Sequence, residues 1–223
     1  MSPRGPARRR PGGESTLRLA LGKGRNLPVA VAAFRAAGLD LAALEEPARR
    51  LIVELPEAGL EVLLLKDADL PLYVAYGVAD LGVVGSDLLG ESDGDLLVPA
   101  RFRDGRSRLA LIGRAGALPE PGGQVRLATK YPETARRVVA RKPWGAEVLP
   151  LSGSVELAPL LDLAEVALDI VQTGRTLRDN GLEELETVAE VAPCLVVNRA
   201  SYLRHRERIN DLVRRLEAAE VVT

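Results

Sequence analysis

From Leu17 onward, short apolar runs alternate with stretches of helical periodicity, and this alternation constrains the fold more than any other feature. It is typical of βαβ units built on a mostly parallel sheet. We expect strands over residues 17–21, 51–55, 60–66, 79–84, 108–112, 125–128, 147–151, 168–171 and 195–198. We expect helices over residues 28–37, 71–77, 132–142, 155–161 and 202–220, and one that begins near Ser86. Asp69 and Ser86 are residue types that cap helix N-termini.

The helix expected over residues 202–220 is amphipathic, because apolar side chains recur at helical spacing while Arg and Glu occupy the other face. Its apolar residues are Leu203, Ile209, Leu212, Val213 and Leu216. We therefore expect it to dock on a core. His205 lies between two arginines and is expected on the solvated face, whereas Cys194 precedes an apolar strand and is expected to be buried.

The polar stretch at residues 101–106 divides the chain into two blocks of similar size. We expect one α/β lobe from residues 16–100 with 196–223, and a second from residues 101–195. The predicted fold class is therefore α/β, two-lobed, with mixed, mostly parallel sheets and a ligand cleft between the lobes, at the carboxyl ends of the strands. Residues 1–15 carry four Arg and three Pro without apolar periodicity and are expected to form a flexible basic tail.

Composition excludes several classes of function. The 30 basic and 31 acidic residues give a net charge of −1, so bulk charge favours neither a nucleic acid nor a membrane surface as partner. A single Cys and a single His exclude a disulfide framework and a Cys/His zinc site, and leave little room for Ser-His-Asp chemistry. No apolar run reaches the roughly 18 residues of a membrane span, and no secretory signal is present, so we expect a cytoplasmic protein.

The first candidate site is the loop Gly22-Lys-Gly-Arg25, between an expected strand and an expected helix. Glycines allow an anion to approach the backbone, and a helix N-terminus offers free amides. Lys23 and Arg25 add two positive charges. The spacing matches neither the dinucleotide fingerprint nor the P-loop, so an ordinary βα turn is the alternative.

The second candidate site is the segment Asp169-Ile-Val-Gln-Thr-Gly-Arg-Thr176. Asp169 lies on an apolar strand that runs directly into Thr173-Gly174-Arg175-Thr176. Two hydroxyls, a glycine and successive amides can form a nest for a phosphate dianion, while the carboxylate can accept hydrogen bonds from two sugar hydroxyls. This pattern suits a ribose 5-phosphate. The alternative is an ordinary strand end whose threonines reflect β propensity.

Two weaker candidate residues lie at the starts of expected helices. Glu156, in Ser152-Gly-Ser-Val-Glu-Leu-Ala-Pro159, interrupts an apolar stretch, but helix capping with Ser154 as the cap explains the segment equally well. Asp87 follows an expected strand end at Gly85 and can face a ligand amine, or Ser86-Asp87 can simply open a helix.

Six segments in order resemble the ATP phosphoribosyltransferase family, the first enzyme of histidine biosynthesis. They are the Lys23-Gly-Arg25 loop, Ala79-Asp-Leu-Gly-Val-Val-Gly85, Ala128-Thr-Lys-Tyr-Pro132, Ser152 to Leu160, Asp169 to Leu177, and Asn180-Gly-Leu182. The resemblance runs from about Leu17 to Tyr202. It implies a two-lobed fold like that of the periplasmic binding proteins, and the reaction of ATP with 5-phosphoribosyl 1-diphosphate to give 1-(5-phosphoribosyl)-ATP and diphosphate, with Mg²⁺.

The resemblance also implies residue roles. Glu156 and Asp169 would bind the ribose hydroxyls, and Thr173, Gly174, Arg175 and Thr176 the 5-phosphate. Lys23, Arg25 and Arg50 match positions near the diphosphate and the nucleotide, where they would neutralise charge. The ATP-binding positions would be Lys23, Gly24, Asp87 and Tyr131, the last two near the purine. No protein metal ligand is expected, because Mg²⁺ would be carried by the substrate phosphates, and we assign no general base.

The chain resembles the short form of the family, because it ends at Thr223 without an extra regulatory domain. The short form implies a regulatory subunit related to histidyl-tRNA synthetase and a homodimer within a hetero-oligomer. Two positions depart from the family pattern: Asp162 stands where Gly is usual, and Ser107 where many members have Cys. Residues 102–107 also replace a more glycine-rich run.

Two rival hypotheses remain open from the sequence. A two-lobed fold also serves non-catalytic modules that bind small molecules, although the segment from Asp169 to Thr176 argues against a pure binder. A different phosphoribosyltransferase is the second rival. Its usual loop places paired acidic residues directly before Thr-Gly-x-Thr, whereas here Ile170-Val-Gln172 intervene.

Overall fold

The computed structural model describes residues 16–44, 50–92 and 94–223, which form two compact units. The first unit comprises the described residues up to Gly85 together with Gly94–Gly105 and Pro193–Thr223. The second comprises residues 86–92 and Arg106–Ala192. The basic tail expected at residues 1–15 lies outside the described residues. No helix in the described part of the chain has the length and apolar character needed to cross a membrane.

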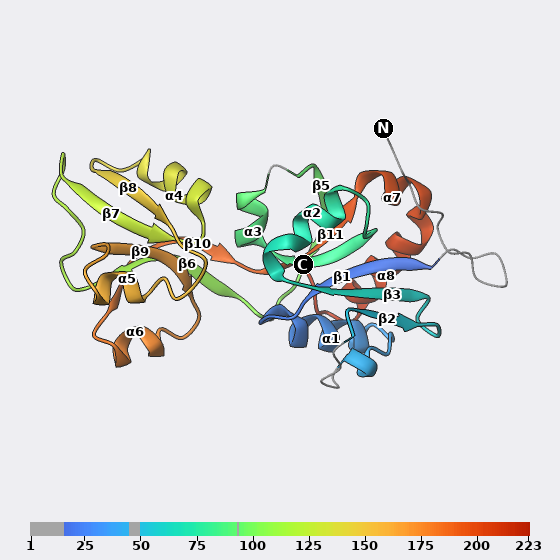
Figure 1. The fold of residues 1–223 in the computed structure, drawn as a ribbon. Helices are drawn as coiled ribbons and strands as arrows, with labels where there is room; N and C mark the ends of the chain where they lie inside the picture. Colours follow the sequence, from blue (N-terminus) through green and yellow to red (C-terminus); the bar gives the residue numbers. More distant parts are fainter. Residues whose placement is uncertain (1–15, 45–49, 93) are drawn as a thin grey trace. The chain divides into compact units, whose positions relative to one another are not determined.

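The first unit is built on one mixed sheet (Figure 1). Among the described residues, the sheet has six strands in the order β2-β3-β1-β4-β11-β5. The strands are β1 (Leu17–Gly22), β2 (Ile52–Leu55), β3 (Leu60–Leu65), β4 (Leu81–Gly85), β5 (Leu96–Arg101) and β11 (Pro193–Asn198). The helices are α1 (Asn26–Ala36), α2 (Leu70–Ala75), α7 (Arg199–Arg204) and α8 (Arg206–Ala218).

Helices cover both faces of this sheet, which explains why its inner strands are apolar at successive positions. Leu19 on β1 points into a core that contains Phe34 of α1 and Ile209 of α8, all three fully buried. On the opposite face α2 packs so closely on β4 that a Cβ at Gly82 would lie 3.1 Å from a methyl carbon of Val74. The close packing therefore favours glycine at position 82.

The second unit carries a mixed sheet in the order β10-β6-β9-β7-β8, five strands among the described residues. These strands are β6 (Ser107–Gly113), β7 (Gln124–Thr129), β8 (Gly145–Pro150), β9 (Val166–Val171) and β10 (Glu183–Val191). The helices are α3 (Ser86–Glu91), α4 (Pro132–Val139), α5 (Leu157–Leu160) and α6 (Arg175–Asp179). Figure 1 shows α4 on one side of the sheet and α5 and α6 on the other.

Alternate residues of the second sheet enter two separate apolar clusters. Leu168 packs with Trp144 and Ala135 on the α4 side, whereas its neighbour Ala167 packs with Ala158 and Leu177 on the α5 and α6 side. Burial on both sides fixes the register of β9, because a shift by one residue would exchange the two faces. The register of β9 in turn fixes where Asp169 emerges.

The sheets are mixed, as the sequence predicts. Within the described residues, four strand pairings are parallel and five are antiparallel, so the parallel share is smaller than expected. The difference arises because β5 and β10, which the sequence did not suggest, each join a sheet edge in the antiparallel sense.

The unit boundaries differ from the expected division. Residues 86–92, expected in the first lobe, belong to the second unit because α3 packs on α4. Residues up to Gly105, expected in the second lobe, belong to the first unit, since Phe102 is fully buried in its core. Residues 193–195 also belong to the first unit, where β11 begins.

The expected C-terminal helix is two helices, because the backbone at His205 (φ −124°, ψ 27°) separates α7 from α8. Leu203 is therefore 78% exposed and does not reach the core that buries Ile209. His205 is half-buried instead of lying on a solvated face, and this burial lowers its pKa. Cys194 is fully buried, as expected.

Neither expected cap residue acts through its side chain. Asp69 occupies the N-cap position of α2 without a side-chain hydrogen bond. Ser86 is the first residue of α3, and its hydroxyl accepts a hydrogen bond from the Ala192 backbone N–H instead, at 3.2 Å.

Candidate active site

The loop from Gly22 to Arg25 joins β1 to α1 and is anchored to the end of β3. The Lys23 N–H donates to the Leu65 carbonyl at 3.0 Å, and Arg25 is the N-cap residue of α1. A Cβ at Gly24 would lie 2.2 Å from Oδ2 of Asp67, and one at Gly22 would lie 1.6 Å from Oδ1. The Asp67 carboxylate thus lies directly against the loop, and a side chain at either glycine would displace it. The side chain of Lys23 is exposed.

Arg50 precedes β2 and lines a surface cavity of about 590 Å³. The other residues that line the cavity are Arg18, Ile52, Glu54 and Glu61, and Arg18 forms an ion pair with Glu61 at 3.3 Å. Among the described residues, this lining includes neither Lys23 nor Arg25. The structure therefore places Arg50 in a setting of mixed charge.

Asp169 lies near the carboxyl end of β9, and one of its two carboxylate oxygens is firmly held. Oδ1 accepts a hydrogen bond from the Ile170 N–H at 2.7 Å and forms an ion pair with Lys130 at 2.9 Å. Oδ2 accepts no hydrogen bond from the residues that the structure describes, and it is not among their fully buried, unpartnered oxygens. The carboxylate thus keeps one oxygen for a ligand.

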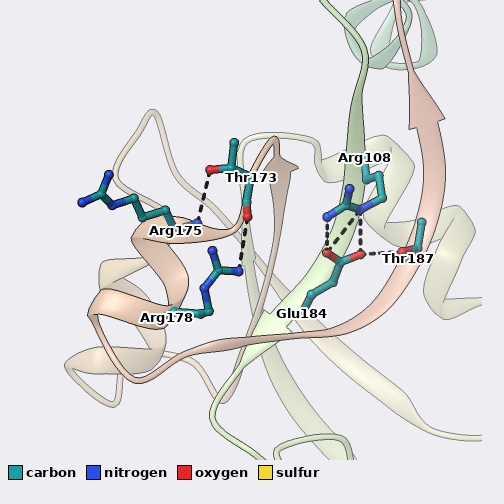
Figure 2. A network of polar contacts seen from close by, with 6 residues as sticks. All are labelled: Arg108, Thr173, Arg175, Arg178, Glu184 and Thr187. Carbon is teal, nitrogen blue, oxygen red and sulfur yellow. Dashed lines mark hydrogen bonds and ion pairs between the residues drawn. The ribbon is translucent and has the colours of Figure 1, made fainter.

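The loop after β9 has the geometry of an open anion nest. Gly174 adopts φ +67° and ψ 11°, the left-handed conformation that favours glycine, and α6 begins at the next residue. Figure 2 shows Thr173 beside two arginines: the Arg175 N–H donates weakly to its hydroxyl at 3.4 Å, and Arg178 donates to its carbonyl at 3.3 Å. Thr173, Arg175 and Thr176 are exposed, so hydroxyl, guanidinium and amide donors face solvent.

Glu156 is the N-cap residue of α5, on the same face of the sheet as α6. No side chain makes a capping hydrogen bond there, so the hypothesis that Ser154 caps this helix is wrong. Ser154 instead adopts φ +47° and contributes its carbonyl to a backbone turn with Leu157. The Glu156 side chain is partly exposed and is not consumed by capping.

Asp87 and Tyr131 form a buried polar pair in the second unit. The Tyr131 hydroxyl donates to Oδ2 of Asp87 at 2.7 Å, and the two residues are 2% and 7% exposed. The carboxylate of Glu91 accepts hydrogen bonds from the N–H groups of Glu133 and Thr134, at 3.0 and 2.6 Å. Because these N–H groups open α4 and lack partners within the helix, Glu91 fixes α3, and with it Asp87, against α4.

Lys130 is a site residue that the sequence analysis did not select. Its ammonium reaches Asp169 at 2.9 Å and lies 5.3 Å from the centre of the Tyr131 ring. It thus contacts both the predicted sugar-binding carboxylate and the predicted purine-binding tyrosine. The sequence did hold a signal for Lys130. The chain has only four lysines against 26 arginines, so a lysine directly before Tyr131, a predicted site residue, is unusual.

A second polar network braces the edge strand β10 against β6 (Figure 2). Arg108 binds both carboxylate oxygens of Glu184, with its Nη2 at 2.8 Å, and Thr187 donates to the same carboxylate. The Arg108 hydrogen bonds lower the pKa of Glu184, and Glu184 raises the pKa of Arg108. The charges of Arg108 and Glu184 offset each other, and the pair links β10 to β6.

The structure explains one of the two departures from the family pattern, Asp162, and nothing in it explains the other, Ser107. Asp162 adopts φ +58°, the left-handed region that favours glycine, and its carboxylate pairs with Arg114 at 2.8 Å. Ser107 is buried, and its hydroxyl has no hydrogen-bond partner among the described residues. In the same part of the chain, no group of three His, Cys, Asp or Glu side chains is arranged to hold a metal ion.

The chain folds into two α/β units, each built on a mixed sheet, and this architecture defines a class of two-lobed α/β proteins. The periplasmic aliphatic sulphonate binding protein SsuA from Escherichia coli has the same fold. It superimposes with a TM-score of 0.62 at 12% identity, over 91% of this chain and 72% of that chain. The expected two-lobed fold, like that of the periplasmic binding proteins, is confirmed.

Comparisons with known sequences identify the family. The family described as HisG, ATP phosphoribosyltransferase, matches residues 66–218. The ATP phosphoribosyltransferase of Sorangium cellulosum is 46% identical over 203 residues, 91% of this chain and 95% of that protein. A structure of the ATP phosphoribosyl transferase (HisG:HisZ) complex from Thermotoga maritima matches with a TM-score of 0.78 and 33% identity, over 91% of this chain and 98% of that chain.

The chain therefore belongs to the ATP phosphoribosyltransferase family. The resemblance that the sequence motifs indicated is confirmed, and so is the expected function, phosphoribosyl transfer to ATP at the first step of histidine biosynthesis. The chain is a transferase, and the non-catalytic binding module is excluded as its function.

Proposed function

We propose that this chain uses the segment from Asp169 to Thr176 to bind 5-phosphoribosyl 1-diphosphate and transfers its phosphoribosyl group to N1 of ATP. The observation that carries the proposal is the state of the Asp169 carboxylate, which holds Oδ1 in place and leaves Oδ2 for a ligand, directly before a loop of exposed donors. Asp169, with Glu156, would accept hydrogen bonds from the ribose hydroxyls. Thr173, Gly174, Arg175 and Thr176 would donate to the 5-phosphate.

The nucleotide would be recognised by Lys23, Gly24, Asp87 and Tyr131. Asp87 and Tyr131 are buried together, so a purine near them would meet a fixed polar edge. Lys23 is exposed on the β1–α1 loop, where its ammonium can reach phosphate oxygens. Gly24, which has no side chain, leaves room for the Asp67 carboxylate beside that loop.

In the reaction, adenine N1 donates its lone pair to the anomeric carbon, and the bond from this carbon to the diphosphate oxygen breaks. Diphosphate leaves with the bonding electrons, and the sugar carries positive charge in the transition state. Because N1 is already nucleophilic, the protein must position the substrates and neutralise the leaving group, and a general base is not needed. Lys23, Arg25 and Arg50 would supply positive charge for this purpose.

Magnesium would enter with the substrate phosphates. Mg²⁺ prefers phosphate and carboxylate oxygens, and when bound it would neutralise the diphosphate as it leaves. A regulatory subunit related to histidyl-tRNA synthetase would complete a hetero-oligomer that contains a homodimer of this chain. The Thermotoga maritima structure of a HisG:HisZ complex supports this assembly. We place the enzyme in the cytoplasm.

The test is to mix the protein and its regulatory partner with ATP, 5-phosphoribosyl 1-diphosphate and Mg²⁺, and to follow the ultraviolet absorbance of the N1 adduct. Asp169→Ala should raise KM for 5-phosphoribosyl 1-diphosphate about 100-fold, since it removes hydrogen bonds to a charged acceptor. The binding of ATP should change far less. Glu120→Ala, an exposed carboxylate in the same unit, is the matched control. Equal weakening of both substrates by Asp169→Ala would contradict the assignment.

A further inference from the structure

Lys130 is placed to control the carboxylate on which the proposed function rests. We propose that Lys130 is a positioning residue, which holds the Asp169 carboxylate in the orientation that binds the ribose of 5-phosphoribosyl 1-diphosphate. The inference depends on the role proposed for Asp169, and it adds a residue to which neither the motifs nor the family resemblance gave a role.

The ion pair divides the two oxygens of Asp169 between protein and ligand. Oδ1 receives both the Lys130 ammonium at 2.9 Å and the Ile170 N–H at 2.7 Å. The ion pair and the hydrogen bond on one oxygen together oppose rotation of the carboxylate about its bond to Cβ. Oδ2 therefore keeps one direction, and a sugar hydroxyl can donate to it without reorganising the side chain.

The lysine itself is held from two sides. Its ammonium lies 5.3 Å from the centre of the Tyr131 ring, within the roughly 6 Å range of a cation–π contact. The turn that carries it is pinned by Thr129, whose fully buried hydroxyl accepts from the Tyr131 N–H at 2.9 Å and donates to the Leu168 carbonyl at 2.8 Å. Leu168 precedes Asp169, so one hydroxyl ties the backbones beside both members of the ion pair.

Charge gives the second reason for this lysine. The proposed ligand of the loop is a ribose that carries a 5-phosphate and a 1-diphosphate, and an uncompensated carboxylate would repel these negative groups. With the side chains of Lys130 and Asp169 39% and 16% exposed, the pair is only partly screened by water. The lysine offsets the negative charge of Asp169 while leaving its acceptor oxygen available.

The experiment compares Lys130→Met, which keeps much of the aliphatic stem, with Lys130→Arg, which restores the charge. Lys142→Met is the matched control, because Lys142 forms an ion pair with Glu186 elsewhere in the same unit. The measurements are calorimetric binding of 5-phosphoribosyl 1-diphosphate without ATP, and KM and kcat with the regulatory partner present. Lys130→Met should weaken binding and raise KM about tenfold, because Asp169 loses the ion pair that orients its carboxylate, with kcat within about twofold. Lys130→Arg should recover most of the loss.

Each other outcome overturns the inference in a recognisable way. If Asp169→Ala abolishes binding while Lys130→Met binds like the wild type, the inference is wrong and the proposed function stands. If Lys130→Met lowers kcat with KM unchanged, Lys130 acts in the chemical step instead of positioning. If Lys142→Met weakens binding equally, the effect is general loss of charge or stability. A wild-type enzyme that binds no 5-phosphoribosyl 1-diphosphate would overturn both proposals.

Discussion

Gly174→Ala isolates the contribution of backbone conformation to substrate binding. Gly174 has φ +67° at the start of α6, inside the proposed phosphate loop. A Cβ built there would lie 3.4 Å from Nη1 of Arg178 and 3.7 Å from Cγ1 of Val171, so an alanine methyl fits. The penalty is therefore conformational, since a left-handed backbone costs an L-residue with a Cβ about 1–2 kcal/mol.

Because the loop is exposed, we expect this conformational penalty to appear in substrate binding and not in the stability of the fold. Thr173 and Arg175 are joined by only a weak 3.4 Å hydrogen bond, so the free loop can relax to another conformation in the variant. Binding of the 5-phosphate must then restore the left-handed conformation. Because each 1.36 kcal/mol is a factor of ten, KM for 5-phosphoribosyl 1-diphosphate should rise about 5- to 30-fold. The midpoint of urea unfolding should change little.

Gly122→Ala is the control for this prediction. Gly122 has φ +82°, with nothing within 4 Å of a Cβ built on it, and lies between β6 and β7. It imposes a similar backbone penalty outside the proposed site, so it should lower the unfolding midpoint and leave KM unchanged. Initial rates at saturating ATP, with 5-phosphoribosyl 1-diphosphate varied, measure both variants. A Gly174→Ala enzyme with KM within about twofold of wild type would refute the reasoning.

Two further predictions concern stability and ionisation. Hydrogen bonds from Arg126 lower the pKa of Glu165 to about 2, so the stabilisation from this pair is present above pH 4.5 and is lost as the pH falls towards 2. Carboxyl NMR titration should show this pKa and its return towards 4.5 in Arg126→Gln; an unchanged pKa in the variant would contradict the assignment. Ser107→Cys should raise the free energy of unfolding by about 1 kcal/mol, because it removes a buried hydroxyl without a partner. A loss of stability in urea unfolding would show that this hydroxyl is satisfied in solution.

The inner strands could be predicted from the sequence because strands that are buried on both faces consist almost entirely of apolar residues. The expected strand at residues 17–21 is β1, which is covered by helices on one face and packed on α2 at the other, so nearly every position is apolar. The edge strand β10 gave no such signal. It is rich in Glu, has no buried residue before Val191, and is held by pairing with β6 and by the ion pair of Glu184 with Arg108. Both are tertiary contacts that local propensity does not record.

The break between α7 and α8 at His205 could not be predicted from the periodicity of apolar residues either. An amphipathic pattern predicts which face of a helix is apolar, but a single non-helical residue rotates everything that precedes it. Ile209 and Leu216 satisfy the pattern on α8, whereas Leu203 on α7 is exposed. The predicted apolar face was therefore correct for α8, which follows His205, and wrong for Leu203 on α7.

The candidate site was predicted as residue types and motifs, and the contacts that organise it were not. The sequence assigned Asp87 to the first lobe, because the boundary between the lobes was expected at the polar stretch of residues 101–106. Two contacts hold Asp87 in the second unit. The Glu91 carboxylate of α3 accepts hydrogen bonds from the first N–H groups of α4, and the Tyr131 hydroxyl donates to Asp87 itself. Both partners lie more than 40 residues along the chain, so no local pattern reports them.

This placement has a chemical consequence. Asp87 and Tyr131, proposed at the purine, now share one folded unit with Asp169, proposed at the ribose. Lys130 touches both groups, and Thr129 ties the backbones from which they project. The distance between the side chains proposed at the purine and at the ribose therefore depends on the pairing of β7 with β9 within one unit. Two paired strands that are buried on both faces hold the side chains at their ends at a fixed separation. A substitution that shifts the pairing of β7 with β9 should therefore raise KM for both substrates.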